Sequence, residues 1–135
     1  MKKAYFILFM MFALTIFCSC GEYVKSYVAT ILITSSHGDE ANMKFDTFKG
    51  TYNFKLKSDD FEENSIDIEA SLGEGTMNIY IGTDGGKELI LTLNSCEAFD
   101  KTIFLDEKYS NKKTVYIILE SNGKCFNGDF EFEYN

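Results

Sequence analysis

The residues closest to a catalytic set lie in the segment TSSHGDE at positions 34–40. Ser35, Ser36, His37 and Asp39 supply the nucleophile, base and carboxylate types that a serine hydrolase uses. The three groups of a triad must converge from separate elements, however, and these are neighbours in the chain. The chain also has no G-x-S-x-G elbow. We therefore expect a polar loop here and no enzyme, with a hydrolase that uses His37 as the alternative.

A second cluster has the chemistry of a cation site. The segment SDDFEEN at 58–64 carries Asp59, Asp60, Glu62 and Glu63, and loop carboxylates are the ligands that calcium prefers. The segment lacks the D-x-D-x-D-G spacing of a calcium loop. We expect a solvated loop and no cofactor, and a calcium-dependent carbohydrate-binding module of the cell surface is the alternative function.

The start of the chain has the pattern of an export signal. Lys2 and Lys3 precede a run of 14 residues, Ala4 to Phe17, in which every residue but Thr15 is apolar. About 20 apolar residues are needed to span a bilayer as a helix, whereas 7–15 suffice for the core of a signal peptide. The pattern predicts a cleaved signal over residues 1–19.

Phe17-Cys18-Ser19-Cys20 at the end of this run resembles the lipobox of bacterial lipoproteins, with a small residue before the cysteine. The resemblance implies cleavage before Cys20 and a diacylated cysteine at the new N-terminus. Residues 20–24 would then be a short tether, and 25–135 a single domain facing outside the cytoplasm at the bacterial cell envelope. An ordinary secretory signal, with Cys18 and Cys20 incidental, is the alternative.

Two cysteines remain in the mature chain, Cys96 and Cys125. An exported protein meets oxidising conditions, so the sequence predicts a disulfide between them. Two reduced cysteines, buried as small hydrophobic residues, are the alternative.

The charge balance excludes some partners. The mature chain has 11 lysines, no arginine and 21 acidic residues, a net charge of about −10. Such a chain repels nucleic acid and anionic headgroups. We expect no nucleic-acid partner, and a membrane association that depends on the lipid.

The elements after residue 25 follow an alternation of apolar and polar residues, which is typical of half-buried strands. Turn-forming residues at 73–75, 84–86, 110–113 and 121–124 separate the segments. About eight strands are expected, with further ones near 24–34, 43–47 and 103–105, and together they predict an all-β chain folded as one antiparallel, jelly-roll-like sandwich. The expected core-facing sets are Tyr52, Phe54 and Leu56; Ile66, Ile68, Ala70 and Leu72; Met77, Ile79 and Ile81; Leu89, Leu91 and Leu93; Val115, Ile117 and Leu119; and Phe130, Phe132 and Tyr134.

The rhythm of TYNFKLKSDD, GTMNIYIGTDGG, TVYIILES and GDFEFEY resembles the bacterial pre-peptidase C-terminal domain and related jelly rolls. That family is non-catalytic and occurs on secreted and surface proteins. The resemblance implies no site residues.

Four apolar residues break the alternation, because Tyr80, Ile90, Tyr116 and Ile118 fall on the side opposite the expected core. Exposed aromatic and aliphatic patches mark interaction sites. We expect a contact surface here for an envelope protein or a polysaccharide. The alternative is that the first segment or a loop covers these residues as a second small core. The sequence thus predicts a lipid-anchored envelope protein with a binding or structural β-domain.

Overall fold

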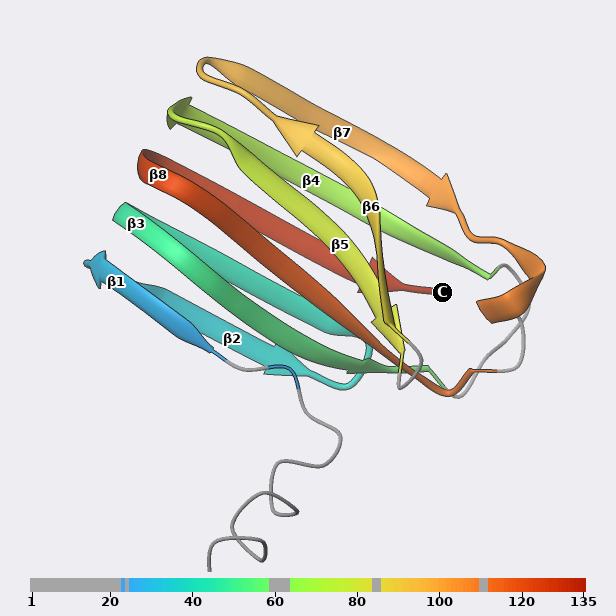
Figure 1. The fold of residues 1–135 in the computed structure, drawn as a ribbon. Helices are drawn as coiled ribbons and strands as arrows, with labels where there is room; N and C mark the ends of the chain where they lie inside the picture. Colours follow the sequence, from blue (N-terminus) through green and yellow to red (C-terminus); the bar gives the residue numbers. More distant parts are fainter. Residues whose placement is uncertain (1–22, 24, 59–63, 84–85, 110–111) are drawn as a thin grey trace, which may run out of the picture.

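The computed structural model describes residues 23, 25–58, 64–83, 86–109 and 112–135 (Figure 1). Apart from one 3₁₀ turn at Glu107–Tyr109, its regular elements are strands. The strands are β1 (Ser26–Thr30), β2 (Ile33–His37), β3 (Glu40–Lys57), β4 (Ser65–Glu74), β5 (Met77–Thr83), β6 (Gly86–Leu93), β7 (Glu97–Phe104) and β8 (Thr114–Tyr134).

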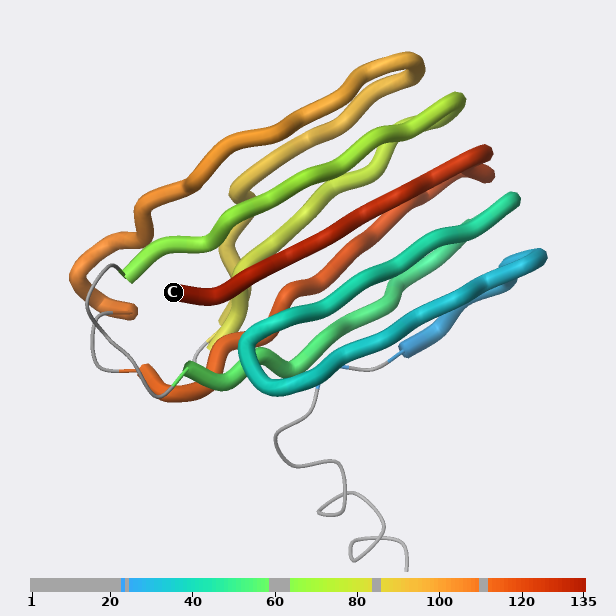
Figure 2. Tube along the Cα trace, turned by 180° about the vertical axis from the view of Figure 1, so that it is seen from behind, coloured from blue at the N-terminus to red at the C-terminus, as the bar shows by residue number. Residues whose placement is uncertain are grey.

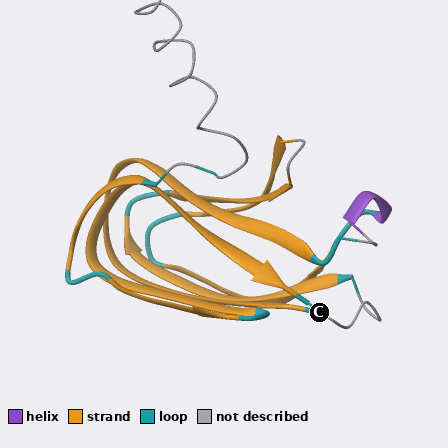
Figure 3. Ribbon diagram, turned by 90° about the horizontal axis from the view of Figure 1, so that it is seen from below, coloured by secondary structure: helices purple, strands orange, loops and turns teal. Residues whose placement is uncertain are grey.

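All pairings belong to one antiparallel sheet that folds over on itself. The first layer contains β2, residues 40–48 of β3, the second half of β8, β4 and β7. The second contains residues 50–57 of β3, the first half of β8, β5 and β6. Figure 2 shows the end of β8 between β3 and β4, and Figure 3 shows the strands curving from one layer into the other. The predicted all-β antiparallel sandwich is confirmed.

The bends explain two differences from the predicted strand list. β3 and β8, with 18 and 21 residues, are continuous strands that belong to both layers, so residues 121–124 are a bend and not the turn of a hairpin. The segment 73–75 likewise leads from β4 to β5, which both pair with β8 and not with each other. Short turn signals in a sequence mark a change of direction, but they do not say whether the chain reverses or crosses to another layer.

A residue with a positive φ lies at or near the bend of each of five segments, namely β1–β2, β3, β4–β5, β6–β7 and β8. These residues are Ile31 between β1 and β2 (φ 50°), Gly50 in β3 (121°), Gly75 between β4 and β5 (106°), Cys96 between β6 and β7 (60°) and Asn127 in β8 (53°). Left-handed backbone interrupts the extended path and bends a strand, as in a β-bulge. Glycine and asparagine adopt it at low cost, whereas β-branched isoleucine does not.

The core lies between the layers, and the predicted core-facing residues of β3, β4, β5 and β8 are all buried. The exception is β6, where Leu93 is 2% exposed but Leu89 is 51% exposed. The register of β5 and β6 shifts by one residue at Ile90, so Leu89 lies opposite Tyr80 on the outer side. A one-residue shift turns every following side chain to the other face. The prediction of Leu89 as core is therefore wrong because of a bulge.

Candidate functional site

The expected aromatic contact surface is mostly covered. Tyr116 and Ile118 are 8% and 1% exposed. The ring of Tyr23 lies over Tyr116, with 5.2 Å between the ring centroids. Tyr23 is held there by two hydrogen bonds, because its hydroxyl donates to the Thr83 carbonyl at 2.7 Å and its own carbonyl accepts from the Asn53 amide at 2.6 Å. The predicted exposure of Tyr116 and Ile118 is wrong, and the alternative of a small second core describes them.

The two remaining members of this stripe are half-buried. The Lys87 ammonium lies 4.4 Å from the centre of the Tyr80 ring, and Ile90 lies at the bulge of β6. Lys87 also forms an ion pair with Glu120 at 2.7 Å. These contacts leave no continuous apolar surface across Tyr80, Ile90, Tyr116 and Ile118.

The two cysteines are free thiols, so the predicted disulfide is not formed in the structure. Cys125 is buried and its Sγ donates to the Thr76 carbonyl at 3.4 Å. Cys96 is exposed at the bend between β6 and β7, and its Sγ donates to the Gly73 carbonyl at 3.4 Å. The bends that bring β4, β7 and β8 to one end of the sandwich give each thiol a backbone partner of its own.

The prediction of a polar loop at TSSHGDE is wrong for residues 34–37, which belong to β2, and only Gly38 and Asp39 form a turn. Ser35, Ser36 and His37 are part of β2, and His37 pairs with Glu40 across a tight turn at Gly38. Successive residues of a strand point to opposite faces, so the two serine side chains point apart. The acidic residues Asp59, Asp60, Glu62 and Glu63 lie outside the described residues.

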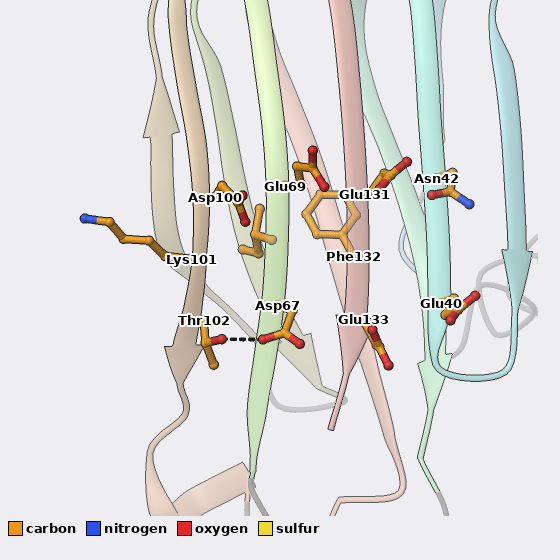
Figure 4. A pocket seen from close by; sticks show the side chains of 11 residues that line it. Glu40, Asn42, Asp67, Glu69, Asp100, Lys101, Thr102, Glu131, Phe132 and Glu133 are labelled. Carbon is orange, nitrogen blue, oxygen red and sulfur yellow. Dashed lines mark hydrogen bonds between the residues drawn. The ribbon is translucent and has the colours of Figure 1, made fainter.

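A different cluster stands out on the outer face of the first layer (Figure 4). Strand register places Glu40, Glu133 and Asp67 side by side across β3, β8 and β4. The next row contains Glu131, Glu69 and Asp100, across β8, β4 and β7. We call these six side chains the carboxylate face. They line a shallow hollow of about 650 Å³ together with Asn42, Thr102 and Lys101.

The alternation of each strand places these carboxylates outside. In β8, Glu131 and Glu133 alternate with the buried rings of Phe130, Phe132 and Tyr134. The sequence therefore indicates that these acids face solvent. It does not show that acids of three strands share two rows, because that depends on register between segments far apart in the chain.

Like charges meet directly in this face. Residues directly opposite on neighbouring strands have Cβ atoms about 4.5–5.5 Å apart, and like charges at that spacing destabilise a sheet. The pKa of Glu133 is raised by partial burial, and further by the charges of Glu40, Asp39 and Asp67. Within the described ranges, the ion pairs found involve Glu120 and Glu88, which lie outside the face.

Two local hydrogen bonds fix one corner of the face. Thr102 Oγ1 donates to Asp67 Oδ1, and Asn135 Nδ2 donates to Asp67 Oδ2 at 3.1 Å. Lys101 comes from the same strand as Thr102, but its side chain extends away from the carboxylates in Figure 4. The orientation of Asp67 is therefore set by neutral donors, and its charge is not compensated there.

The six carboxylates make the face strongly negative. Among the described residues, no group of three or more His, Cys, Asp or Glu side chains is placed to hold one. A row of exposed carboxylates instead suits several separate positive groups, such as lysine or arginine side chains on a partner.

In the part of the chain that the structure describes, no helix is long and apolar enough to cross a membrane.

Comparisons with known proteins add little to this geometry. No protein-family model and no curated protein matches the chain. A similar solved structure is a mutant of Xylanase10C from Cellvibrio japonicus in complex with xylopentaose. The similarity covers 84% of this chain but 26% of that one, at 11% sequence identity and a TM-score of 0.42. At this level it bears on neither activity nor ligand.

Proposed function

We propose that this chain is a lipid-anchored protein of the bacterial cell envelope, whose β-sandwich is a non-catalytic binding domain for a cationic partner. The binding surface is the carboxylate face, and the partner is a lysine- or arginine-rich segment of another envelope protein. The observation that carries the proposal is the direct cross-strand register of acidic residues in two rows.

The like-charged neighbours in the two rows lower the stability of the isolated domain. A cross-strand pair contributes roughly 0.2–1 kcal/mol, and the sign is unfavourable for like charges. Glutamine or threonine at the same outward positions would leave the core unchanged and remove the repulsion. When a partner with positive side chains binds, the electrostatic interaction of these carboxylates becomes favourable, because each carboxylate then gains a charged hydrogen-bond donor.

A basic protein segment fits the face better than a polysaccharide does. Sugar-binding surfaces combine polar groups with aromatic rings on which the sugar packs. The two rows contain carboxylates, Asn42 and Thr102, and the ring of Phe132 points to the core side of the same strand. Electrostatic attraction also speeds encounter with an oppositely charged partner.

The lipid anchor rests on the resemblance of residues 17–20 to a lipobox. Cleavage before Cys20 would leave two acyl chains on the cysteine, and two chains hold a protein stably at a bilayer. The intact mass of the protein from the membrane fraction of its host tests this. A chain that starts at Cys20 and carries acyl groups is expected, and an unmodified chain in the medium would contradict the anchor.

Binding to a lysine-rich peptide tests the carboxylate face. The double variant Glu69→Gln/Glu131→Gln removes two charges from the second row, and Glu74→Gln/Asp106→Asn removes two exposed charges outside both rows. We expect Glu69→Gln/Glu131→Gln to weaken peptide binding roughly three- to tenfold more than the control variant does. Each exposed ion pair between a carboxylate and a peptide lysine contributes up to about 1 kcal/mol. Equal weakening would show attraction by net charge alone and refute a defined face.

A further inference from the structure

The edge formed by β1 and β2 exposes three large aliphatic side chains within six residues. Val28, Ile31 and Ile33 are 77%, 72% and 63% exposed. Single exposed aliphatic residues are ordinary, but a group of them on one edge marks a contact surface. We call these three residues the aliphatic edge. It lies on the opposite side of the sheet from β6 and β7 (Figure 1).

The backbone at Ile31 suggests that this side chain has a role of its own. Ile31 has a φ of 50°, the left-handed region that a β-branched residue rarely adopts. At three of the other bends, the same backbone is formed by Gly50, Gly75 and Asn127, which suit it. An isoleucine here is costly for the bend and exposed to water, so neither the local backbone nor the core accounts for it.

Lysines of β3 lie opposite the aliphatic edge, and no acid lies on the β1 and β2 strands themselves. In strand register, Val28 lies opposite Lys49 and Ile33 lies opposite Lys44. Residues 25–37 include Lys25 and no acidic residue, although the chain has 21 acids. The five residues of β3 that pair with β1 also lack acids. The part of the edge on β1 is therefore apolar and locally positive, whereas Asp46 and Asp129 line a hollow together with Ile31, Ile33 and Lys44.

We propose that the aliphatic edge rests on the surface of the membrane that holds the lipid anchor. The inference depends on the proposed acylation of Cys20. Ser26, the first residue of β1, lies six positions after Cys20, and six extended residues span at most about 22 Å. The anchor thus keeps β1 near the lipid headgroups at high effective concentration, where a weak contact suffices.

The chemistry of the edge suits that position. Aliphatic side chains enter the boundary between headgroups and acyl chains, and lysines lie at the level of anionic phosphates. The carboxylate face lies on the same outward side of the first layer as Ile33, and it extends from Glu40 to Asp100 on β7, the strand farthest from the aliphatic edge. The β6–β7 edge then points away from the bilayer.

The chain has no tryptophan, so a single substitution gives a fluorescent reporter at a chosen position. We would compare Ile33→Trp on β2 with Phe104→Trp on β7, whose native side chain is 76% exposed at the opposite edge. Val28→Trp serves as a second reporter of the aliphatic edge if Ile33→Trp does not fold. Each full-length protein is purified in its acylated form and placed in vesicles of phosphatidylglycerol and brominated phosphatidylcholine.

We expect the emission of Ile33→Trp to shift to the blue and to lose most of its intensity to the bromine atoms, while Phe104→Trp keeps the emission of a residue in water. Equal quenching at both edges, or none at either, in a protein whose mass shows the acyl groups would overturn the docking and leave the anchor intact. A mass without acyl groups would instead overturn the anchor, and the docking with it.

Discussion

Replacing Glu133 by glutamine tests the electrostatic cost of the carboxylate face. The side chain keeps its size, and its charge leaves the centre of the row. Glu133 lies directly opposite Glu40 on one side and Asp67 on the other. Each like-charge pair costs roughly 0.2–1 kcal/mol, and exposed charges lie at the lower end of that range. We therefore expect Glu133→Gln to raise the free energy of unfolding by about 0.5–1 kcal/mol at neutral pH.

The gain should depend on pH in a defined direction. The folded pKa of Glu133 is raised above its unfolded value, which is about 4.3 for glutamate. Between those two values the folded state holds more protons than the unfolded state, so the free energy of unfolding falls as pH rises. The penalty is absent below the unfolded pKa and complete above the folded one. The free energy of unfolding of Glu133→Gln should equal that of the wild-type protein at low pH, and it should be larger than the wild-type value above that pH window.

Urea unfolding at several pH values measures this difference through the midpoint at constant slope. Glu74→Gln is the matched control, because Glu74 lies opposite Phe126 and faces no acid directly. The gain should also shrink in 1 M salt, where the screening length is about 3 Å. A Glu133→Gln protein that is less stable than the wild type, or whose gain is unaffected by pH and salt, would refute the reasoning.

Two further predictions concern the glycines of β8 and the reactivity of the two thiols. Gly128→Ala should lower the free energy of unfolding by about 1–3 kcal/mol, because the ring of Phe45 occupies the space of the added methyl group in a packed core. Gly123→Ala, which has no neighbour within 4 Å, should change it little, and urea midpoints compare the two. A thiol reagent should label Cys96 in the folded protein and Cys125 only after unfolding. Absence of any free thiol would contradict the structure.

The alternation of residues determined the strands and most of the core. The inward residues of β4, β5 and β8 are buried as predicted, because a strand exposes alternate side chains to one face whatever its neighbours are. The exception at Leu89 comes from a bulge, which arises in the pairing of β5 with β6. The signal and lipid anchor are also read from the sequence, and they stay predictions.

The location of the functional surfaces depended on tertiary contacts. Tyr116 looks like an exposed ring in its own strand, and Tyr23, 93 residues earlier, covers it. The thiols of Cys96 and Cys125 meet different carbonyls, since the bends decide where each one lies.

The sequence by itself determined which residues of most strands face the core, and it predicts an export signal at the start of the chain. Only the tertiary structure decided that Glu40, Glu133 and Asp67 form one row, and that Val28 and Ile33 lie on a free edge. The physical reason is that alternation is a local property of one strand. Register, strand order and bends are set by pairing between segments far apart in the chain, and these bring the charges together and leave the edge open.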